Sequence, residues 1–447
     1  MALRDATSIL ALADEVLRRV PGGSDAEVVI DETDSALTRY ALNAIHQNVA
    51  ETGVRLRLRL IRDGRVGVAE LRGEAEDIAD RLVRAAEDAR RLSPAQENVA
   101  PLPDPAIARA EEAKPAAWSD GTAEATPEQR ADAVAVVAGA AAAKGLEAFG
   151  AYETRAQQIA VVNTRGVRRH ARSTVARMTA VVRGDDGAGY ADRCAADVGA
   201  VDPRAVAAES VDTALRNQGA QVVEPGDYEV VLAPYAVAEM IEYLSWLGFG
   251  ALARQEERSF MRPGERLMSQ GVTLRDDGSD PLGLPFPFDW EGVTAQPVTF
   301  VEDGVCRDFV YDTPAAMVDG VRTTGHALPL PNTSGPVATH LVMEPGDRTP
   351  EELIAAVRNG LYVTRFWYVR EVHPLRTVIT GMTREGTFRI ENGRVTTPVR
   401  DLRFTQSIVG ALDTVQGISR DRRLEIPDEG SATLAPWLHI GRFHFSS

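Results

Sequence analysis

The apolar positions in the first half of the chain switch between helical and strand spacing. Residues 6–20 place apolar side chains three and four positions apart, which predicts an amphipathic helix. The strand-like runs that follow cover 26–31, 36–45, 54–61 and 66–69. An Asp63–Gly64 turn joins the last two runs and predicts a hairpin. A second helix over 74–92 closes this first unit.

The same order of elements returns further along the chain. A helix begins after Thr126, which is a good N-cap and is followed by proline. The next strand-like runs cover 148–153, 158–162 and 171–182. A closing helix is predicted over Pro203–Asn217, with Asp202 as its N-cap. Matching residues support the duplication, because an asparagine follows each Glu-Thr pair by about ten positions, at Asn43 and Asn163.

The duplicated pattern predicts one α+β layer domain over residues 1–222. It contains two helix–four-strand–helix units, at about 1–92 and 126–222, and its strands are antiparallel. The intervening segment 93–125 is rich in proline, alanine and glutamate, which is typical of a partly helical connector.

The character of the chain changes after residue 222. Short apolar runs alternate with glycine, proline and aspartate over 223–447, which predicts a β-rich domain with a barrel-like or sandwich-like arrangement. Two helices, about 235–247 and 350–358, interrupt the strands.

Charge and composition narrow the class of partner. The formal net charge of −16 disfavours nucleic acid and anionic membranes as ligands. The longest alanine-rich apolar run, Ala133–Ala143, is too short for a bilayer, which needs about 20 residues. The first residues lack an apolar signal-peptide core. Cys194 and Cys306 are the only cysteines and lie far apart in the sequence, which indicates a reducing compartment. We therefore expect a cytoplasmic protein.

Metal and nucleophile motifs are missing from the sequence. None of the seven histidines is followed by glutamate, and no two lie three or four residues apart, so a helix-borne zinc site is not expected. His439 and His444 are five apart in a predicted strand and should face opposite sides of it. The chain also lacks a G-x-S-x-G elbow and a phosphate-binding loop.

Asp289 and Glu291 lie in the proline-rich segment Pro285–Gly292. In extended backbone, residues two apart share one face, so this carboxylate pair would be able to bind a metal or carry out acid–base chemistry. The alternative is a solvated loop that enters a strand, and spacing alone favours it.

Three other groups have both a functional and a structural interpretation. Asp276, Asp277 and Asp280 resemble the opening of a calcium loop but lack its closing glutamate, which favours a turn. His326, next to Gly325, is a lone histidine, a type that is more often structural than catalytic. The aromatic run 366–368 would be able to line a peptide cleft, although buried strand packing is favoured.

Several segments, taken in order, resemble the TldD/PmbA family, also called modulator of DNA gyrase. The segments that carry the resemblance are Thr38–Asn48, Val161–Gly166, Pro287–Val293, Thr324–Ala327, Gly386–Gly393, Ala435–Ile440 and Phe443–Phe445. The likeness extends nearly from end to end, and the order and spacing of the segments make it specific.

The resemblance implies an N-terminal α+β domain, a β-rich C-terminal domain and dimers that enclose a cavity. TldD-type members carry a His-Glu-x-x-x-His helix and a late cysteine, and they are zinc peptidases. The equivalent helix here, 236–246, holds Glu239 and Glu242 but no histidine, and the late segment 431–436 has no cysteine. This pattern is similar to the PmbA or TldE branch, the metal-free subunit.

The expected function is that of a metal-free subunit that pairs with a TldD-type zinc subunit, or with itself, and helps to cleave unstructured peptides. No zinc or other cofactor and no catalytic residue is expected in this chain. The candidate substrate-cleft residues are Asp289, Glu291, Gly325 and His326, and the two carboxylates would disfavour acidic peptides. Two alternatives remain, a self-sufficient hydrolase that uses Asp289, Glu291 and His326, and a non-enzymatic peptide-binding or gyrase-associated module.

Overall fold

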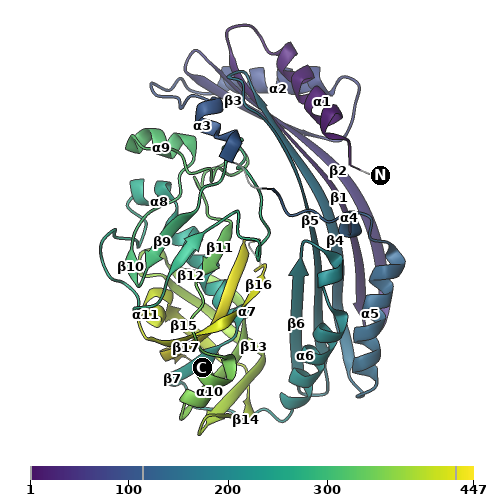
Figure 1. Ribbon diagram of the computed structural model, residues 1–447, viewed down its shortest axis with the longest axis vertical. Helices are drawn as coiled ribbons and strands as arrows, with labels where there is room; N and C mark the ends of the chain where they lie inside the picture. Colours follow the sequence, from purple (N-terminus) through teal and green to yellow (C-terminus); the bar gives the residue numbers. More distant parts are fainter. Residues whose placement is uncertain (1–2, 113–114, 428–429, 447) are drawn as a thin grey trace.

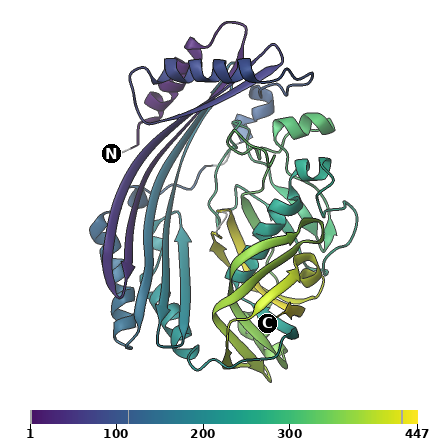
Figure 2. The ribbon, with the colours of Figure 1, turned by 180° about the vertical axis from the view of Figure 1, so that it is seen from behind.

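The computed structural model describes residues 3–112, 115–427 and 430–446. Its N-terminal half is built on a six-stranded antiparallel sheet in the order β3-β2-β1-β4-β5-β6. The strands are β1 (Asp25–Ala41), β2 (Ala44–Arg62), β3 (Arg65–Arg72), β4 (Glu147–Asn163), β5 (Arg168–Arg183) and β6 (Ala188–Ala195). The long strands curve, and the C-terminal domain lies along the concave face of the sheet (Figures 1 and 2).

Helices cover the convex face of the sheet at its two ends. The principal ones are α1 (Ala6–Arg19), α2 (Ile78–Leu92), α5 (Pro127–Ala142) and α6 (Pro203–Arg216). α1 and α2 form one apolar core with the sheet, and α5 and α6 form another at the opposite end. The predicted caps are present, since the Thr126 side chain accepts from Gln129 N–H and the Asp202 side chain accepts from Arg204 N–H.

Each unit of the duplication contains three strands, so the prediction of four was wrong. The runs 26–31 and 36–45 belong mainly to β1, and the runs 148–153 and 158–162 belong to β4. The polar residues between these runs indicated breaks, but the strands continue through them. Thr33 and Ser35 are polar because they face a cavity rather than a core, and Glu32 on the other face is buried in an ion pair with Arg4.

The connector between the units is partly helical, as expected. It contains α3 (Pro105–Ala108), a 3-10 turn (Ala110–Glu112) and α4 (Asp120–Ala123). It also contacts the second domain, because Thr294 N–H donates to Ala108 O at 2.9 Å.

The second half of the chain forms a barrel-like β domain with a mixed sheet. Its strands are β7 (Gly226–Leu232), β8 (Leu274–Asp276), β9 (Val298–Glu302), β10 (Val305–Cys306), β11 (His340–Met343), β12 (Asn359–His373), β13 (Val378–Glu391), β14 (Arg394–Val399), β15 (Arg403–Ser407), β16 (Val415–Glu425) and β17 (Ala432–Phe445). β7 pairs with both β12 and β17, which closes the path β17-β15-β13-β12-β7 on itself.

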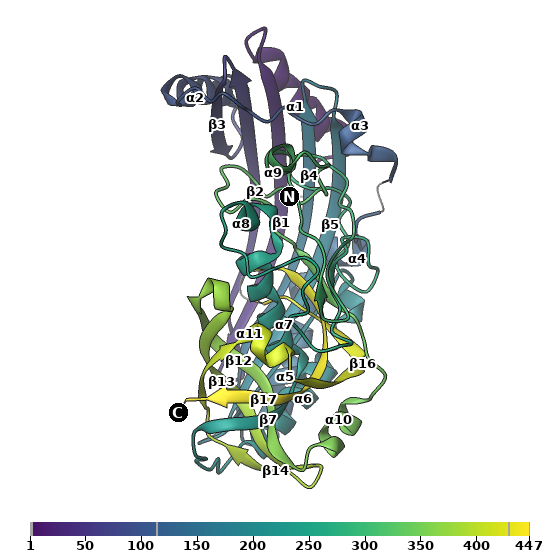
Figure 3. The ribbon, with the colours of Figure 1, turned by 90° about the vertical axis from the view of Figure 1, so that its left-hand side faces the viewer.

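Helices interrupt this domain at more places than the two expected. They are α7 (Pro234–Leu244) with a π-helical turn (Ser245–Phe249), α8 (Ala251–Gln255), α9 (Thr313–Asp319), α10 (Pro350–Ala356) and α11 (Ile408–Leu412). α7 contributes to the large apolar core of the domain. Figure 3 shows the domain in front of the sheet, whose β3 end extends beyond it.

His439 and His444 do not face opposite sides of β17 as predicted. His439 contacts Glu229 at 2.7 Å and His444 contacts Asp227 at 2.8 Å, and these carboxylates lie two residues apart on β7. The pairing register shifts by one residue between Ile440 and Phe443. This bulge brings the two imidazoles to the same side.

No helix among the residues of the three described ranges is long and apolar enough to cross a membrane.

Candidate functional site

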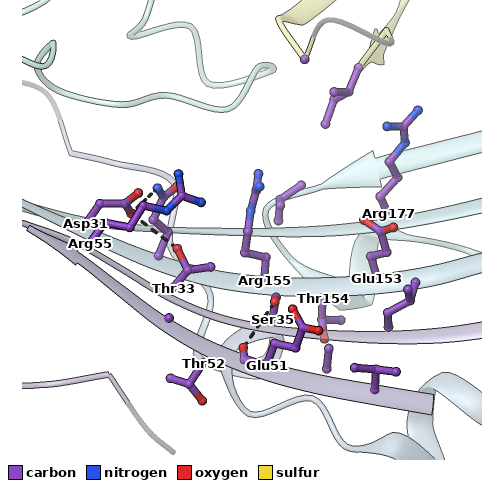
Figure 4. Close-up of a pocket in the computed structure, with 18 of the residues that line it drawn as sticks. Asp31, Thr33, Ser35, Glu51, Thr52, Arg55, Glu153, Thr154, Arg155 and Arg177 are labelled. Carbon is purple, nitrogen blue, oxygen red and sulfur yellow. Dashed lines mark hydrogen bonds between the residues drawn. The ribbon is translucent and has the colours of Figure 1, made fainter. Parts of the chain in front are cut away.

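A cavity of about 870 Å³ lies between the concave face of the N-terminal sheet and the C-terminal domain (Figure 4). Side chains of β1, β2, β4 and β5 form one wall, and Trp290, Pro329, Ile426 and Gly430 contribute to the other. The sheet contacts the second domain on either side of this cavity, through two groups of charged residues. These two attachments define the candidate site.

Alternation along β2 explains why this wall is charged. Arg55, Arg57 and Arg59 occupy every second position, and the intervening positions are leucines. The leucines, 56, 58 and 60, belong to the core beneath α1 and α2. Because successive side chains of a strand point to opposite faces, the arginines face the C-terminal domain.

The first attachment centres on Arg59, which is 8% exposed. Its guanidinium lies 3.0 Å from a Glu27 carboxylate oxygen within the sheet and 3.1 Å from Glu291 of the second domain. Glu291 also accepts a hydrogen bond from Thr313 N–H at 3.0 Å. The ion pairs therefore join the two domains.

Burial is the main cause of the raised carboxyl pKa values in this cluster. It raises the pKa of Glu27 to about 7, although Arg59 opposes the rise and Glu291 adds to it. Burial also raises the pKa of Asp312 to about 6, with Glu291 again contributing. The cluster holds more carboxylates than guanidinium groups, so protons are expected to bind to it near neutral pH.

Asp289 organises a tight turn next to this cluster. Its carboxylate accepts from the N–H groups of Glu291 and Val293, both at 2.9 Å, and of Ala327 at 2.8 Å. Burial and the charge of Glu291 raise the pKa of Asp289, and the three N–H donors oppose the rise. The carboxylates of Asp289 and Glu291 thus have separate partners and do not form an acid–base pair on one strand face.

Replacing Asp289 with alanine should lower the free energy of unfolding by about 2–3 kcal/mol, because three buried N–H groups lose their acceptor. Urea unfolding measures this loss. Asp289→Asn keeps one carbonyl acceptor and should cost less than half as much. Equal losses in the two variants would contradict the structural role.

Gly325 and His326 hold the neighbouring loop in place. Gly325 has a φ of 77°, and a Cβ there would lie 2.5 Å from Thr294 O, so only glycine fits. The His326 ring lies between Thr324 Oγ1 at 2.9 Å and Asp276 Oδ1 at 3.0 Å. Both ring nitrogens are therefore occupied within the protein.

Asp276 is part of β8 and not of a calcium loop. Its second carboxylate oxygen accepts from His340 N–H at 2.7 Å. Burial favours the neutral acid, but the His326 and His340 neighbours outweigh it and lower the pKa of Asp276. Asp277 and Asp280 pair with Arg275 at 2.6 and 2.9 Å, so their oxygens are used inside the protein.

The predicted cleft residues lie together beside the interdomain cavity. Asp289, Gly325 and His326 line a second cavity of about 310 Å³, which shares Trp290 and Arg155 with the first. Glu291 lines a smaller space of about 40 Å³ next to Arg59. Whether these residues contact a substrate stays a prediction.

The second attachment lies between α6, β6 and the C-terminal domain. Tyr235 Oη accepts from Asp192 N–H at 3.0 Å, and Arg423 lies 3.2 Å from Glu209. Cys194 Sγ donates to Leu424 O at 3.4 Å. Arg177, which lines the cavity, pairs with Asp192 and so connects this group to the cavity wall.

The residues of α7 do not fit a zinc ion. Glu242 is 1% exposed and accepts from Ser431 N–H at 2.9 Å, so a hydrogen bond links α7 to the late segment. Glu239 lines a space of about 70 Å³ together with Arg177 and Arg365. A space lined by two guanidinium groups disfavours a metal cation, because like charges repel. Throughout the described parts of the chain, no group of three or more His, Cys, Asp or Glu side chains is placed to hold a metal.

Sequence reasoning missed two features of this region. Arg39, Arg55 and Arg155 on the cavity wall were not singled out, although the Arg-Leu alternation of 55–60 indicated a strand with one charged and one buried face. Trp367 and Tyr368 are 41% and 60% exposed, against the prediction of burial, and only Phe366 of that run lies in the core.

Two family models match the chain. The PmbA/TldA metallopeptidase central domain matches residues 101–218, and the PmbA/TldA metallopeptidase C-terminal domain matches residues 225–447. The chain belongs to the PmbA/TldD family. Among curated members, a metalloprotease of Methanothermobacter thermautotrophicus is 31% identical over 165 residues, which is 36% of each chain. A metalloprotease TldD homologue of Haemophilus influenzae is 27% identical over 50% of this chain and 48% of its own length.

The aligned segments therefore span about half or less of these curated PmbA/TldD relatives. Solved structures match over almost the whole chain. TldE from Thermococcus kodakarensis has a TM-score of 0.88 at 19% identity, covering 98% of this chain and 100% of that one. A protein of Thermotoga maritima described as a modulator of a DNA gyrase has a TM-score of 0.81 at 17% identity, covering 98% and 99%. At these identities the likeness shows the fold.

Proposed function

We propose that this chain is the metal-free, TldE-like subunit of a heteromeric TldD/TldE-type zinc peptidase, and that it holds unstructured peptides for a zinc-bearing homologue. The observation that carries the proposal is the interdomain cavity, which lies near an α7 whose described side chains form no metal-binding set. This chain belongs to a metallopeptidase family and has an interdomain cavity, but its described residues include no group placed to bind a metal. Such a chain is better suited to hold a peptide substrate than to cleave it.

The surface of the C-terminal domain supports a partner. Large apolar side chains are exposed on the β12–β13 hairpin, namely Trp367, Tyr368, Val372, Leu375 and Met382. Such a cluster is typical of an interaction surface. We assign it to the zinc-bearing homologue, with a second copy of this chain as the alternative partner.

The shape of the site suits extended chains. The cavity is bounded at two attachments, so a folded domain does not fit between the sheet and the C-terminal domain, whereas an extended peptide does. A peptide in that position offers the same main-chain donors and acceptors whatever its sequence. We therefore propose unstructured peptides as the substrate class, in turnover or in the maturation of a peptide product.

A reconstitution experiment tests the proposal. The chain is coexpressed with a zinc-bearing member of the family, and cleavage of one polypeptide is compared in its unfolded and folded forms. We expect a complex that cleaves only the unfolded form. Failure to form a complex, or equal rates on both forms, would refute the proposed role.

The purified chain alone should contain no stoichiometric zinc and should not hydrolyse peptides. Carboxylates such as Glu239 and Glu242, without imidazole or thiolate, are a poor zinc set. Metal analysis after dialysis and an assay with unfolded peptides check both points. About one tightly held zinc per chain, or hydrolysis by the chain alone, would instead favour a self-sufficient enzyme.

A further inference from the structure

The wall of the interdomain cavity carries arginines that have no partner within the described parts of the protein. Arg39, Arg55 and Arg155 line the cavity and are exposed, and none of their side chains makes an ion pair or hydrogen bond with a described residue. Arg57 lines the same cavity and is 9% exposed, and its Nη1 has no hydrogen-bond partner among those residues. In a protein of net charge −16, this is a local concentration of available cations.

The described residues of the same wall include fewer carboxylates than guanidinium groups, namely Asp31, Glu51 and Glu153 against five arginines. Asp31 is 5% exposed and accepts from Gln157 at 2.7 Å. Glu51 and Glu153 are exposed, as Arg55 and Arg155 are, and Arg155 extends from the sheet toward the C-terminal domain (Figure 4). A molecule in the cavity therefore meets more guanidinium groups than carboxylates on the described wall.

Asp289 and Glu291 do not offset this pattern. Their carboxylates are taken up by three backbone N–H groups and by Arg59, respectively. The expectation that they would repel acidic peptides loses its physical basis.

The register of the sheet spaces the free arginines along the cavity. Arg55 pairs with Asp31 and Arg155 pairs with Ser35, so the two arginines lie four residues apart along the strand direction, about 13 Å, on strands two apart. The opposite wall includes apolar side chains, Trp290, Pro329 and Ile426. An extended peptide directs alternate side chains to opposite faces, so one face would meet arginines and the other apolar groups.

We infer that the cavity binds extended peptides whose acidic side chains recur at every second or fourth position, with the carboxylates on Arg55 and Arg155. Guanidinium groups recognise carboxylates through paired, charge-assisted hydrogen bonds. This inference rests on the proposed function in that it names the peptide class for the same cavity.

Direct binding to the isolated chain tests the inference. Fluorescence anisotropy is measured with three labelled ten-residue peptides in which Glu, Gln or Lys occupies every second position and Ala or Leu the others. The Glu peptide should bind about tenfold more tightly than the Gln peptide, and the Lys peptide should bind most weakly. The Glu preference should shrink as salt rises.

Variants locate the effect. R55Q combined with R155Q should remove the Glu preference, while E51Q combined with E153Q should enlarge it. The matched control is R18Q combined with R168Q. Arg18 lies on α1, and Arg168 on β5 contacts Asp14 of α1, so both are outside the cavity lining. This variant should keep the Glu preference of the parent. Gly53→Trp fills the cavity, because no atom lies within 4 Å of the point where a Cβ at residue 53 would stand, and should weaken binding of all three peptides.

Equal binding of the Glu and Gln peptides, or a preference unchanged in R55Q/R155Q, would overturn the inference. Its failure is distinguishable from that of the proposed function, which is judged by complex formation and cleavage. A chain that binds Glu peptides through these arginines but never joins a zinc subunit would retain the inference and lose the function.

Discussion

Arg59→Met should lower the free energy of unfolding by about 3–5 kcal/mol, because it leaves Glu27 and Glu291 buried without their shared cation. Glu27 is 3% and Glu291 5% exposed, so water cannot replace the guanidinium. Urea unfolding followed by tryptophan fluorescence measures the change. Because Glu291 belongs to the second domain, the loss should also weaken the attachment between domains.

Two further variants separate charge from packing. Replacing all three residues, in Glu27→Gln/Arg59→Met/Glu291→Gln, should recover most of the lost stability, since no uncompensated charge remains. Arg57→Met is the neighbouring control, because its partner Glu70 is 25% exposed and can be hydrated. A loss in Arg57→Met as large as in Arg59→Met would show that the buried charges are not the cause.

The stability of the protein should fall by on the order of 3 kcal/mol as pH rises from 5 to 8 through the contribution of Glu27. Its pKa is about 7 in the folded protein and near 4.5 in the unfolded chain. Between these values the folded state holds a proton that the unfolded state has released. The stabilisation is complete at low pH and is lost as pH passes through 7. Asp312, with a pKa of about 6, acts in the same direction.

Glu27→Gln isolates this contribution when its unfolding is compared with that of the parent across the pH range. The variant should lose slope by up to about 1.4 kcal/mol per pH unit. Burial lowers the pKa of His170 and His340, which gives an opposite slope at acidic pH, but both proteins share it. Identical pH profiles would mean that Glu27 ionises normally in the folded state.

Local structure could be predicted from the sequence where a single residue determines it, as at the start of a helix. Thr126 and Asp202 cap their helices as expected, because a side-chain oxygen at this position accepts a hydrogen bond from an otherwise unpaired N–H of the first turn. Strand ends were harder, since polar residues such as Thr33 and Ser35 indicated breaks although they lie inside a strand that faces a cavity.

The site could be predicted only in part, because its residues come from distant segments. Asp289, Gly325 and His326 line one cavity, and their role as substrate-cleft residues stays a prediction. Their contacts could not be foreseen, since Asp289 is satisfied by backbone N–H groups, which carry no sequence signal. Arg155 faces the cavity because β4 pairs with β1 more than 100 residues earlier, and no local pattern records that pairing.

The central pairing of β1 with β4 also sets an order of events during synthesis. The core beneath α1 and α2 includes Leu60, but it also includes Ala160 and Val162 of β4. At roughly 5–20 residues per second, a ribosome needs about 5–20 s to travel from Leu60 to Ala160. During that interval the edge of β1 that will pair with β4 is open, and the apolar side chains of α1 that will pack on β4 lack part of their core. The nascent chain therefore depends on protection from aggregation until the second copy of the repeat emerges.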